Sequence, residues 1–155
     1  MQNKQNNSEV QELTFEELSI INDLQNSGSL IESYIKGHSW TDSFNCITEL
    51  RKINKYHPEY VPNIIENFSQ TILDLLSTGK TLLVKNIFRL IKEWFDAGQQ
   101  VNVEKAVIVF LPVLIKKAST DIGYMKTSAQ EVLTSFSCNC GYEISLTSKL
   151  FKLSK

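Results

Sequence analysis

PNIIENFSQTILDLLSTGKTLLVKNIFRLIKEWF, residues 62–95, is the stretch of sequence that decides the fold. Apolar residues recur at helical spacing through residues 64–76 and again through residues 83–94, which is typical of two helices that each bury one face. Ser77-Thr78-Gly79 separates the two runs with residues that favour a turn. Pro62 suits the first turn of a helix, where its missing amide has no intrahelical partner. The stretch therefore predicts two antiparallel helices joined by a short turn.

Helical patterns of the same kind lie on both sides of this stretch. We expect further helices over about residues 14–26, 29–37, 41–56, 103–118, 125–136 and from 142 onward. In the helix over 41–56, the pattern places Arg51 and Lys52 away from the apolar face. Pro112 lies inside the helix over 103–118, where it should produce a kink at a cost of about 3 kcal/mol.

The helices group into antiparallel pairs over residues 30–56, 62–95 and 103–136. The pairs repeat at roughly 35–40 residues, which is the period of HEAT and armadillo repeats. A single pair of this size cannot bury its own apolar face, so neighbouring pairs must stack into one continuous core. No segment alternates apolar and polar residues as a strand would. We therefore predict an all-α fold, an α-solenoid of stacked antiparallel HEAT-like helix pairs.

Length and composition fit one globular domain. The 155 residues are 42% hydrophobic and 21% charged, and we assign residues 1–13 to a polar tail and residues 14–155 to a single helical-repeat domain. The chain shows no signal-peptide pattern and no apolar window of about 18 residues that could span a membrane. Three cysteines without framework spacing favour a reducing compartment. We expect a soluble protein of the cytoplasm.

Charge is balanced overall but unevenly distributed. The net charge is -1, which gives no reason to expect binding to nucleic acid or to a membrane. Residues 1–79 carry 5 basic and 11 acidic side chains, whereas residues 80–155 carry 11 basic and 6 acidic. The second half could bind an acidic partner, or its lysines could belong to an ordinary solvated surface.

Two short motifs resemble functional sites but lack the rest of their patterns. Ser77-Thr78-Gly79-Lys80-Thr81 resembles the end of a phosphate-binding loop, yet Asp74 stands where the first glycine belongs and a helix precedes it. Cys138 and Cys140 are too close together and too isolated for a structural zinc site. Acidic residues are scattered without a catalytic pairing. We expect no enzyme, no cofactor, no metal and no small-molecule substrate.

The turns within the helix pairs are the remaining candidates for a site, because stacking places them along one edge. Trp40 lies in the first turn, Lys80 in the second and Lys126 just after the third. A tryptophan among polar neighbours is a plausible interface anchor, although its ring could instead fold back onto the adjacent helix. Each lysine alone could simply be solvated. Together they predict a binding edge.

Residues 30–133 resemble a TOG domain of the CLASP and ciliary TOG-array type. The resemblance rests on IKGHSW at 35–40, YHPE at 56–59, the second turn and helix within 76–90, FLPVLIKKA at 110–118 and YMK at 124–126. It implies stacked HEAT/TOG-like helix pairs whose turn edge binds tubulin. By position, Trp40 would take the tryptophan role of the family, Lys80 would lie near the basic second turn, and Lys126 would stand at the third-turn arginine.

The departures from the family pattern refine this expectation. Ser43, Thr81, Ser119 and Thr120 replace turn residues that are basic, or glycine and aspartate, in the family. The chain also has room for only about half of the repeats of a full TOG domain. We therefore expect a structural protein on the microtubule lattice, placed in the microtubule cytoskeleton and in a cilium or axoneme, with tubulin or other axonemal proteins as partners. The alternative is a HEAT-repeat adaptor that binds a protein other than tubulin.

Overall fold

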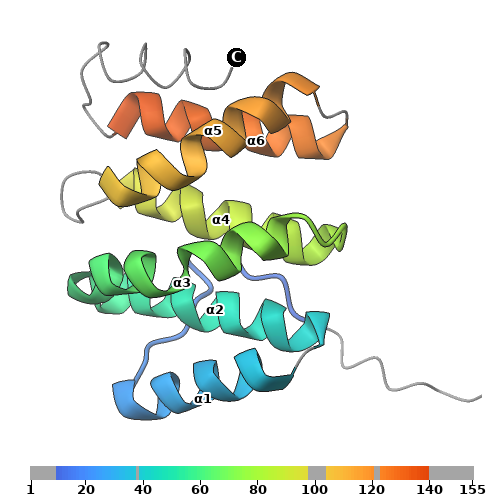
Figure 1. Cartoon of the computed structure of the whole chain (residues 1–155). Coiled ribbons are helices and arrows are strands. Elements are labelled where there is room, and N and C mark those ends of the chain that lie inside the picture. Colours follow the sequence, from blue (N-terminus) through green and yellow to red (C-terminus); the bar gives the residue numbers. More distant parts are fainter. Residues whose placement is uncertain (1–9, 38, 98–103, 121–122, 140–155) are drawn as a thin grey trace, which may run out of the picture.

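The computed structural model describes residues 10–37, 39–97, 104–120 and 123–139, and within them the chain is all-α. The fold class predicted from the apolar spacing is confirmed at this level. The predicted helix from residue 142 lies outside the described residues. The elements, shown in Figure 1, are α1 (Leu24–Gly37), α2 (Trp40–Tyr56), the 3-10 turn η1 (Pro58–Tyr60), α3 (Val61–Leu76), α4 (Thr81–Ala97), α5 (Glu104–Thr120) and α6 (Tyr124–Asn139).

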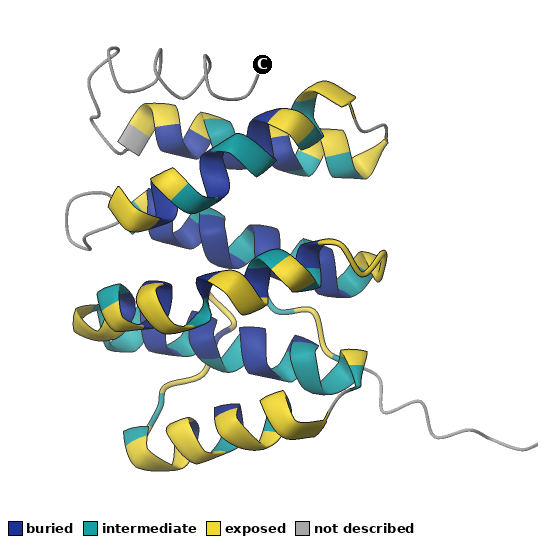
Figure 2. Ribbon diagram, viewed as in Figure 1, coloured by how far each residue is buried: buried dark blue, intermediate teal, exposed yellow. Residues whose placement is uncertain are grey.

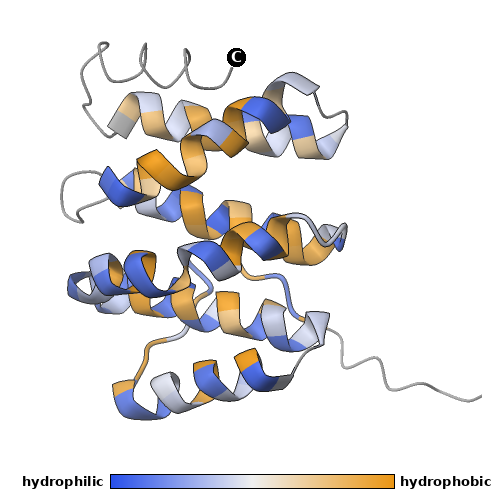
Figure 3. Cartoon of the chain, viewed as in Figure 1, coloured by the Kyte–Doolittle hydropathy of each residue, from blue (hydrophilic) through white to orange (hydrophobic). Residues whose placement is uncertain are grey.

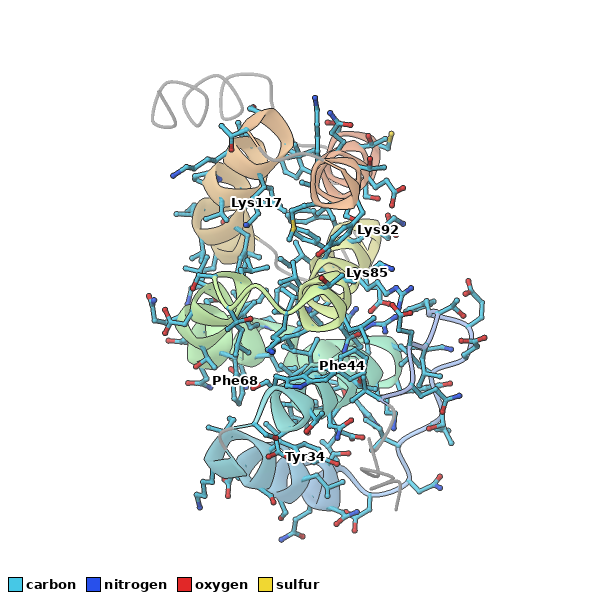
Figure 4. The ribbon with its side chains drawn as sticks, turned by 90° about the vertical axis from the view of Figure 1, so that its right-hand side faces the viewer. Tyr34, Phe44, Phe68, Lys85, Lys92 and Lys117 are labelled. Carbon is cyan, nitrogen blue, oxygen red and sulfur yellow. The ribbon has the colours of Figure 1, made fainter. Side chains whose placement is uncertain are left out.

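The helices form two layers. Viewed from the right-hand side of Figure 1, as in Figure 4, α1, α3 and α5 lie in one layer and α2, α4 and α6 in the other. Within each pair α1 contacts α2, α3 contacts α4 and α5 contacts α6. Between pairs, α2 contacts α4, α4 contacts α6, and α3 contacts α5. Each helix from α2 to α6 therefore packs against both its pair partner and a neighbouring pair, whereas α1 packs mainly against α2.

The core runs along the interface between the two layers, with α4 at its centre (Figure 2). The Trp94 ring of α4 lies 6.0 Å from the Phe110 ring of α5, and the Phe95 ring lies 5.3 Å from the Phe136 ring of α6. Hydrophobic residues continue along α5 (Figure 3), and Pro112 lies inside that helix without ending it. Aromatic packing by α4 thus joins the last two pairs.

Local signals place most of the helix ends where the sequence predicts them. The Ser39 hydroxyl caps α2 by accepting a hydrogen bond from the Asp42 amide at 3.0 Å. Pro62 lies in the first turn of α3, as expected from its missing amide. Trp40 differs from the prediction, because it is the first residue of α2 and not part of the preceding turn. The cap at Ser39 allows the helix to begin immediately after it.

The predicted helix over residues 14–26 is wrong, whereas the predicted helix over residues 29–37 is present as the later part of a longer helix. The structure has a single turn at residues 15–17 and then one helix, α1, capped by the Asp23 carboxylate, which accepts from the amides of Gln25 and Asn26. The Thr14 amide donates to Glu17 Oε2 at 2.9 Å, as in a capping box at the start of a helix. No helix forms over residues 14–23, because side chains of α2 bind the main-chain carbonyls that a helix would use.

Residues 10–23, here called the strap, cross the outer side of α2 and α4 (Figure 4). Glu12 lies 3.7 Å from Lys85 and 3.6 Å from Arg89, both in α4. Val10 packs against the core. Residues 10–13 were predicted as part of the polar tail, and the structure instead places them on the domain. The rest of that predicted tail, residues 1–9, lies outside the described residues.

Arg51 is the clearest reversal of a sequence prediction. Its side chain is 1% exposed, although the helical pattern places it on the polar side of α2. The guanidinium binds both carboxylate oxygens of Glu93 in α4, donates to Asn86 Oδ1 at 3.0 Å and donates to the Leu13 carbonyl at 2.7 Å. Burial raises the pKa of the Glu93 carboxyl, and the hydrogen bonds and charge of Arg51 oppose that rise. This ion pair joins α2, α4 and the strap.

Candidate functional site

The turns inside the three helix pairs lie along one edge of the molecule, at the right of Figure 1. Trp40 begins α2, Lys80 immediately precedes α4, and Lys126 lies in the first turn of α6. Antiparallel pairs stacked in the same direction bring these chain positions to a common edge. The predicted site residues are therefore on one side of the fold, although they are not all in contact.

Trp40 and Lys80 share a groove of about 400 Å³, here called the turn-edge groove. It lies between the start of α2, the end of α3 and the start of α4. Lys126 does not line it. The lining residues are Ile35, Ser39, Trp40, Ser43, Cys46, Thr71, Leu75, Thr78, Lys80 and Leu83. The structure thus joins two of the three predicted site residues in one hollow.

The groove has an apolar floor and a polar rim. Leu83 and Cys46, at 0% and 5% exposure, form buried parts of the wall, while Ile35 is 42% exposed. Lys80 is the one charged side chain among the lining residues, and hydroxyl groups supply the other polar atoms. Trp40 is 36% exposed, so part of its ring remains open to solvent. This combination suits an apolar side chain of a partner next to an acidic group.

The α3–α4 turn holds Lys80 at the rim through its own hydrogen bonds. Thr78 Oγ1 donates to the Leu75 carbonyl at 2.9 Å, and Ser77 Oγ donates to the Asp74 carbonyl at 2.7 Å. Gly79 has a φ of 73°, which glycine adopts without steric cost. The segment that resembles a phosphate-binding loop is therefore a helix–turn–helix connection, and its conformation follows from closing the turn.

The reactivity of the Cys46 thiol reports whether the floor of the turn-edge groove is closed to solvent. Burial and the neighbouring Glu49 raise the pKa of the Cys46 thiol to about 12. At pH 8 only about one thiol in ten thousand would then be ionised. We predict that iodoacetamide at pH 8 alkylates exposed Cys138 at least about a hundred times faster than Cys46, because the thiolate is the nucleophile. Peptide mapping by mass spectrometry separates the two sites. Equal rates in the folded protein would contradict a closed floor.

The third turn carries additional basic and aromatic side chains. Lys126 and Tyr124 are exposed at the start of α6, and Lys85 Nζ of α4 lies 5.8 Å from the centre of the Tyr124 ring. Figure 4, which faces this edge, shows Lys85 on α4, at mid-height in the molecule between α2 and α6. Lys85 thus bridges the second and third turns. It extends the basic character of the edge from the turn-edge groove toward Lys126.

Sequence reasoning missed the apolar walls of the groove. Ile35 and Leu75 end their helices on the side that faces Trp40 and Lys80, but the sequence gives no sign that the two helix ends meet in one hollow. Their phase in the helical pattern marks them only as apolar face residues. Helix direction and turn position together could have suggested Ile35, which lies close to the predicted first turn.

Comparison with protein-family models, curated proteins and solved structures finds no match for this chain.

In residues 10–37, 39–97, 104–120 and 123–139, no three or more His, Cys, Asp or Glu side chains gather as a metal site would require. No helix within those same ranges is both long enough and apolar enough to cross a membrane. Cys140, half of the predicted C-x-C pair, lies outside the described residues, so the pair as a whole is not described.

Proposed function

We propose that this chain is a non-enzymatic α-solenoid of HEAT/TOG-like helix pairs that binds tubulin through its turn edge. The observation that carries the proposal is the turn-edge groove, which both Trp40 and Lys80 line. An exposed aromatic beside a single cation suits a protein surface that offers an apolar contact and a carboxylate. The resemblance of residues 30–133 to TOG domains supplies tubulin as the partner.

The arrangement of the helices supports this proposal. Each helix contacts its pair partner, and α2, α4 and α6 contact one another in chain order, as stacked repeats would. The outer side of α1 is mostly polar, which suits a terminal repeat. Lys80 and Lys126 add positive charge to the same edge, which favours an acidic surface, while Lys85 beside them lies 3.7 Å from Glu12 of the strap.

We propose that the chain binds tubulin in the lattice of a polymerised microtubule. We place this microtubule in a cilium or axoneme. The described residues form three helix pairs, about half of the repeats of a full TOG domain, so the turn edge described here offers a smaller contact area than a domain that captures free tubulin would use. Contacts with other axonemal proteins bound to the same lattice would compensate for the small contact area, because several linked contacts raise the overall affinity. A tagged copy should concentrate along axonemes; a uniform cytoplasmic signal in ciliated cells would contradict this placement.

One observation favours the alternative, an adaptor for a different protein. Lys80 is the single charged residue among the lining residues of the turn-edge groove, and Ser43 and Thr81 stand where TOG domains are basic. A groove with so little charge also suits a short apolar segment of another protein. The adaptor reading predicts that charge at this edge contributes little to affinity.

Charge reversal separates the two proposals. The double variant Lys80→Glu/Lys126→Glu should weaken binding to stabilised microtubules by about tenfold or more at low salt, because it places carboxylates against an acidic partner. Lys105→Glu is the matched control, since Lys105 is 64% exposed and begins α5 at the opposite edge. Affinity is measured by titration, and circular dichroism checks that each variant is folded.

A further substitution tests the groove itself. Trp40→Ala should weaken the same binding by about tenfold, because a partly exposed tryptophan at a contact is often a dominant anchor. Binding that survives both Trp40→Ala and the double charge reversal would move the microtubule contact to another face. Loss with Trp40→Ala alone, and none with charge reversal, would favour the adaptor.

A further inference from the structure

Side chains of α2 hold the strap through hydrogen bonds to its main chain. Arg51 Nη1 donates to the Leu13 carbonyl at 2.7 Å, Lys55 Nζ donates to the Phe15 carbonyl at 2.6 Å, and Tyr56 OH donates to the Leu18 carbonyl at 2.7 Å. All of the donors are side chains of one helix, and they bind carbonyls on both sides of the turn at residues 15–17. Contacts of this kind recognise a peptide backbone whatever its side chains are.

Two features give the contact selectivity. Leu18 is 1% exposed and is the buried anchor of the strap. The strap also carries four acidic residues and no basic one, whereas Lys55, Lys85, Arg89 and Lys92 line or flank its path on α2 and α4. Opposite charge and a single apolar anchor are how short acidic peptides are distinguished from others.

The site is larger than the segment that fills it. A pocket of about 490 Å³ remains between the strap and the ends of α2 and α4, lined by Arg51, Lys55, Arg89 and Lys92 among others. Asn54 lines the same pocket, is 6% exposed, and its Oδ1 atom accepts no hydrogen bond from the described residues. A buried acceptor without a donor is costly, and the strap as seated does not supply one.

We propose that this face of α2 and α4 is a binding site for an acidic peptide that carries a leucine anchor and a turn before it, which residues 10–23 fill in cis. The partner that we propose is the same segment of a second copy of the chain, because its sequence is identical to that of the strap. Because the strap is tethered, its effective concentration is of millimolar order, so a free peptide competes only when the tethered copy is weakened. The inference rests on the observed seating of the strap and is independent of the proposed binding of tubulin.

The test uses the full chain and a fluorescein-labelled peptide of residues 10–23, with fluorescence anisotropy as the readout. In the chain, Leu18→Ala removes the anchor of the tethered strap and leaves the donors of α2 intact. The peptide should bind this variant at least about tenfold more tightly than it binds the unaltered chain. A peptide that itself carries Leu18→Ala should bind at least about tenfold more weakly, because it lacks the anchor.

The controls keep the outcome interpretable. Lys55→Met added to the Leu18→Ala chain removes the donor to the strap carbonyls and should abolish binding. If the Leu18→Ala chain is not folded by circular dichroism, Glu12→Gln weakens the tethered strap at a solvent-exposed ion pair instead. A folded variant with a weakened strap that binds the peptide no more tightly than the unaltered chain would overturn the proposal. So would binding unaffected by Lys55→Met.

Discussion

Replacing Arg51 with methionine is expected to lower the free energy of unfolding by about 3–5 kcal/mol, because it leaves a buried carboxylate without its partner. Arg51 and Glu93 are 1% and 8% exposed, so water cannot replace the lost contact. The substitution also removes the donors to Asn86 and to the Leu13 carbonyl. Denaturant unfolding followed by circular dichroism measures the change. The strap should be released at lower denaturant concentration than the helices.

Lys52→Met is the matched control for this experiment. Lys52 lies next to Arg51 in α2, is 20% exposed, and pairs with Glu49 within the same helix at 3.0 Å. An ion pair of this kind contributes about 0–1 kcal/mol, so the control should remain close to the unaltered protein. The double variant Arg51→Met/Glu93→Met should recover most of the lost stability, since it removes the unpaired charge as well. A loss below about 1 kcal/mol for Arg51→Met would contradict a buried ion pair.

The Arg51→Met deficit should also depend on pH. Burial raises the pKa of Glu93 even with Arg51 in place, and removing the cation raises the pKa further. A carboxyl whose pKa is higher in the folded than in the unfolded protein favours folding at low pH, and that contribution is lost as pH rises through the folded pKa. The difference between variant and parent should therefore be smaller at pH 5 than at pH 8. The opposite trend would contradict this assignment.

Replacing Trp94 with alanine is the second change with a large expected effect. Trp94 is fully buried in α4 and packs against Phe110 of α5, so its removal leaves a cavity at the junction between two helix pairs. We expect a loss of about 3–5 kcal/mol. Trp94→Phe should cost far less, about 1 kcal/mol, because phenylalanine fills most of the space. It also removes the buried indole Nε1, which has no hydrogen-bond partner among the described residues.

The comparison between the two Trp94 variants tests the packing directly. Both are measured by the same denaturant unfolding, with the Trp94→Phe protein as the matched control for loss of the indole. If Trp94→Phe proves as costly as Trp94→Ala, the indole nitrogen makes a stabilising hydrogen bond that the structure does not contain. If both changes are mild, α4 does not lie at the centre of the core.

Much of the fold can be predicted from the sequence because it depends on local patterns. Residues 62–95 carry apolar residues at helical spacing with turn residues between, and α3 and α4 follow that pattern closely. The strap could not be predicted, because its partners are distant in sequence. Lys55 binds carbonyls about 40 residues away, and no local pattern in residues 14–26 reveals that competition with helix formation. The burial of Arg51 is missed for the same reason.

The candidate site divides in a similar way. The sequence predicts that Trp40, Lys80 and Lys126 lie near turns, and stacked pairs bring those turns to one edge. It does not predict that Trp40 and Lys80 line one groove while Lys126 lies apart, because that depends on how helix ends pack across pairs. The binding of tubulin remains a prediction based on resemblance and on the chemistry of this edge.

Co-sedimentation of the purified chain with stabilised microtubules, at low and at physiological salt, tests the central proposal most directly. Size-exclusion chromatography with free tubulin is run beside it. We predict that the chain pellets with microtubules, more strongly at low salt because its edge is basic, and forms no complex with free tubulin. A chain that stays in the supernatant at both salt concentrations, while folded by circular dichroism, would contradict the proposed function.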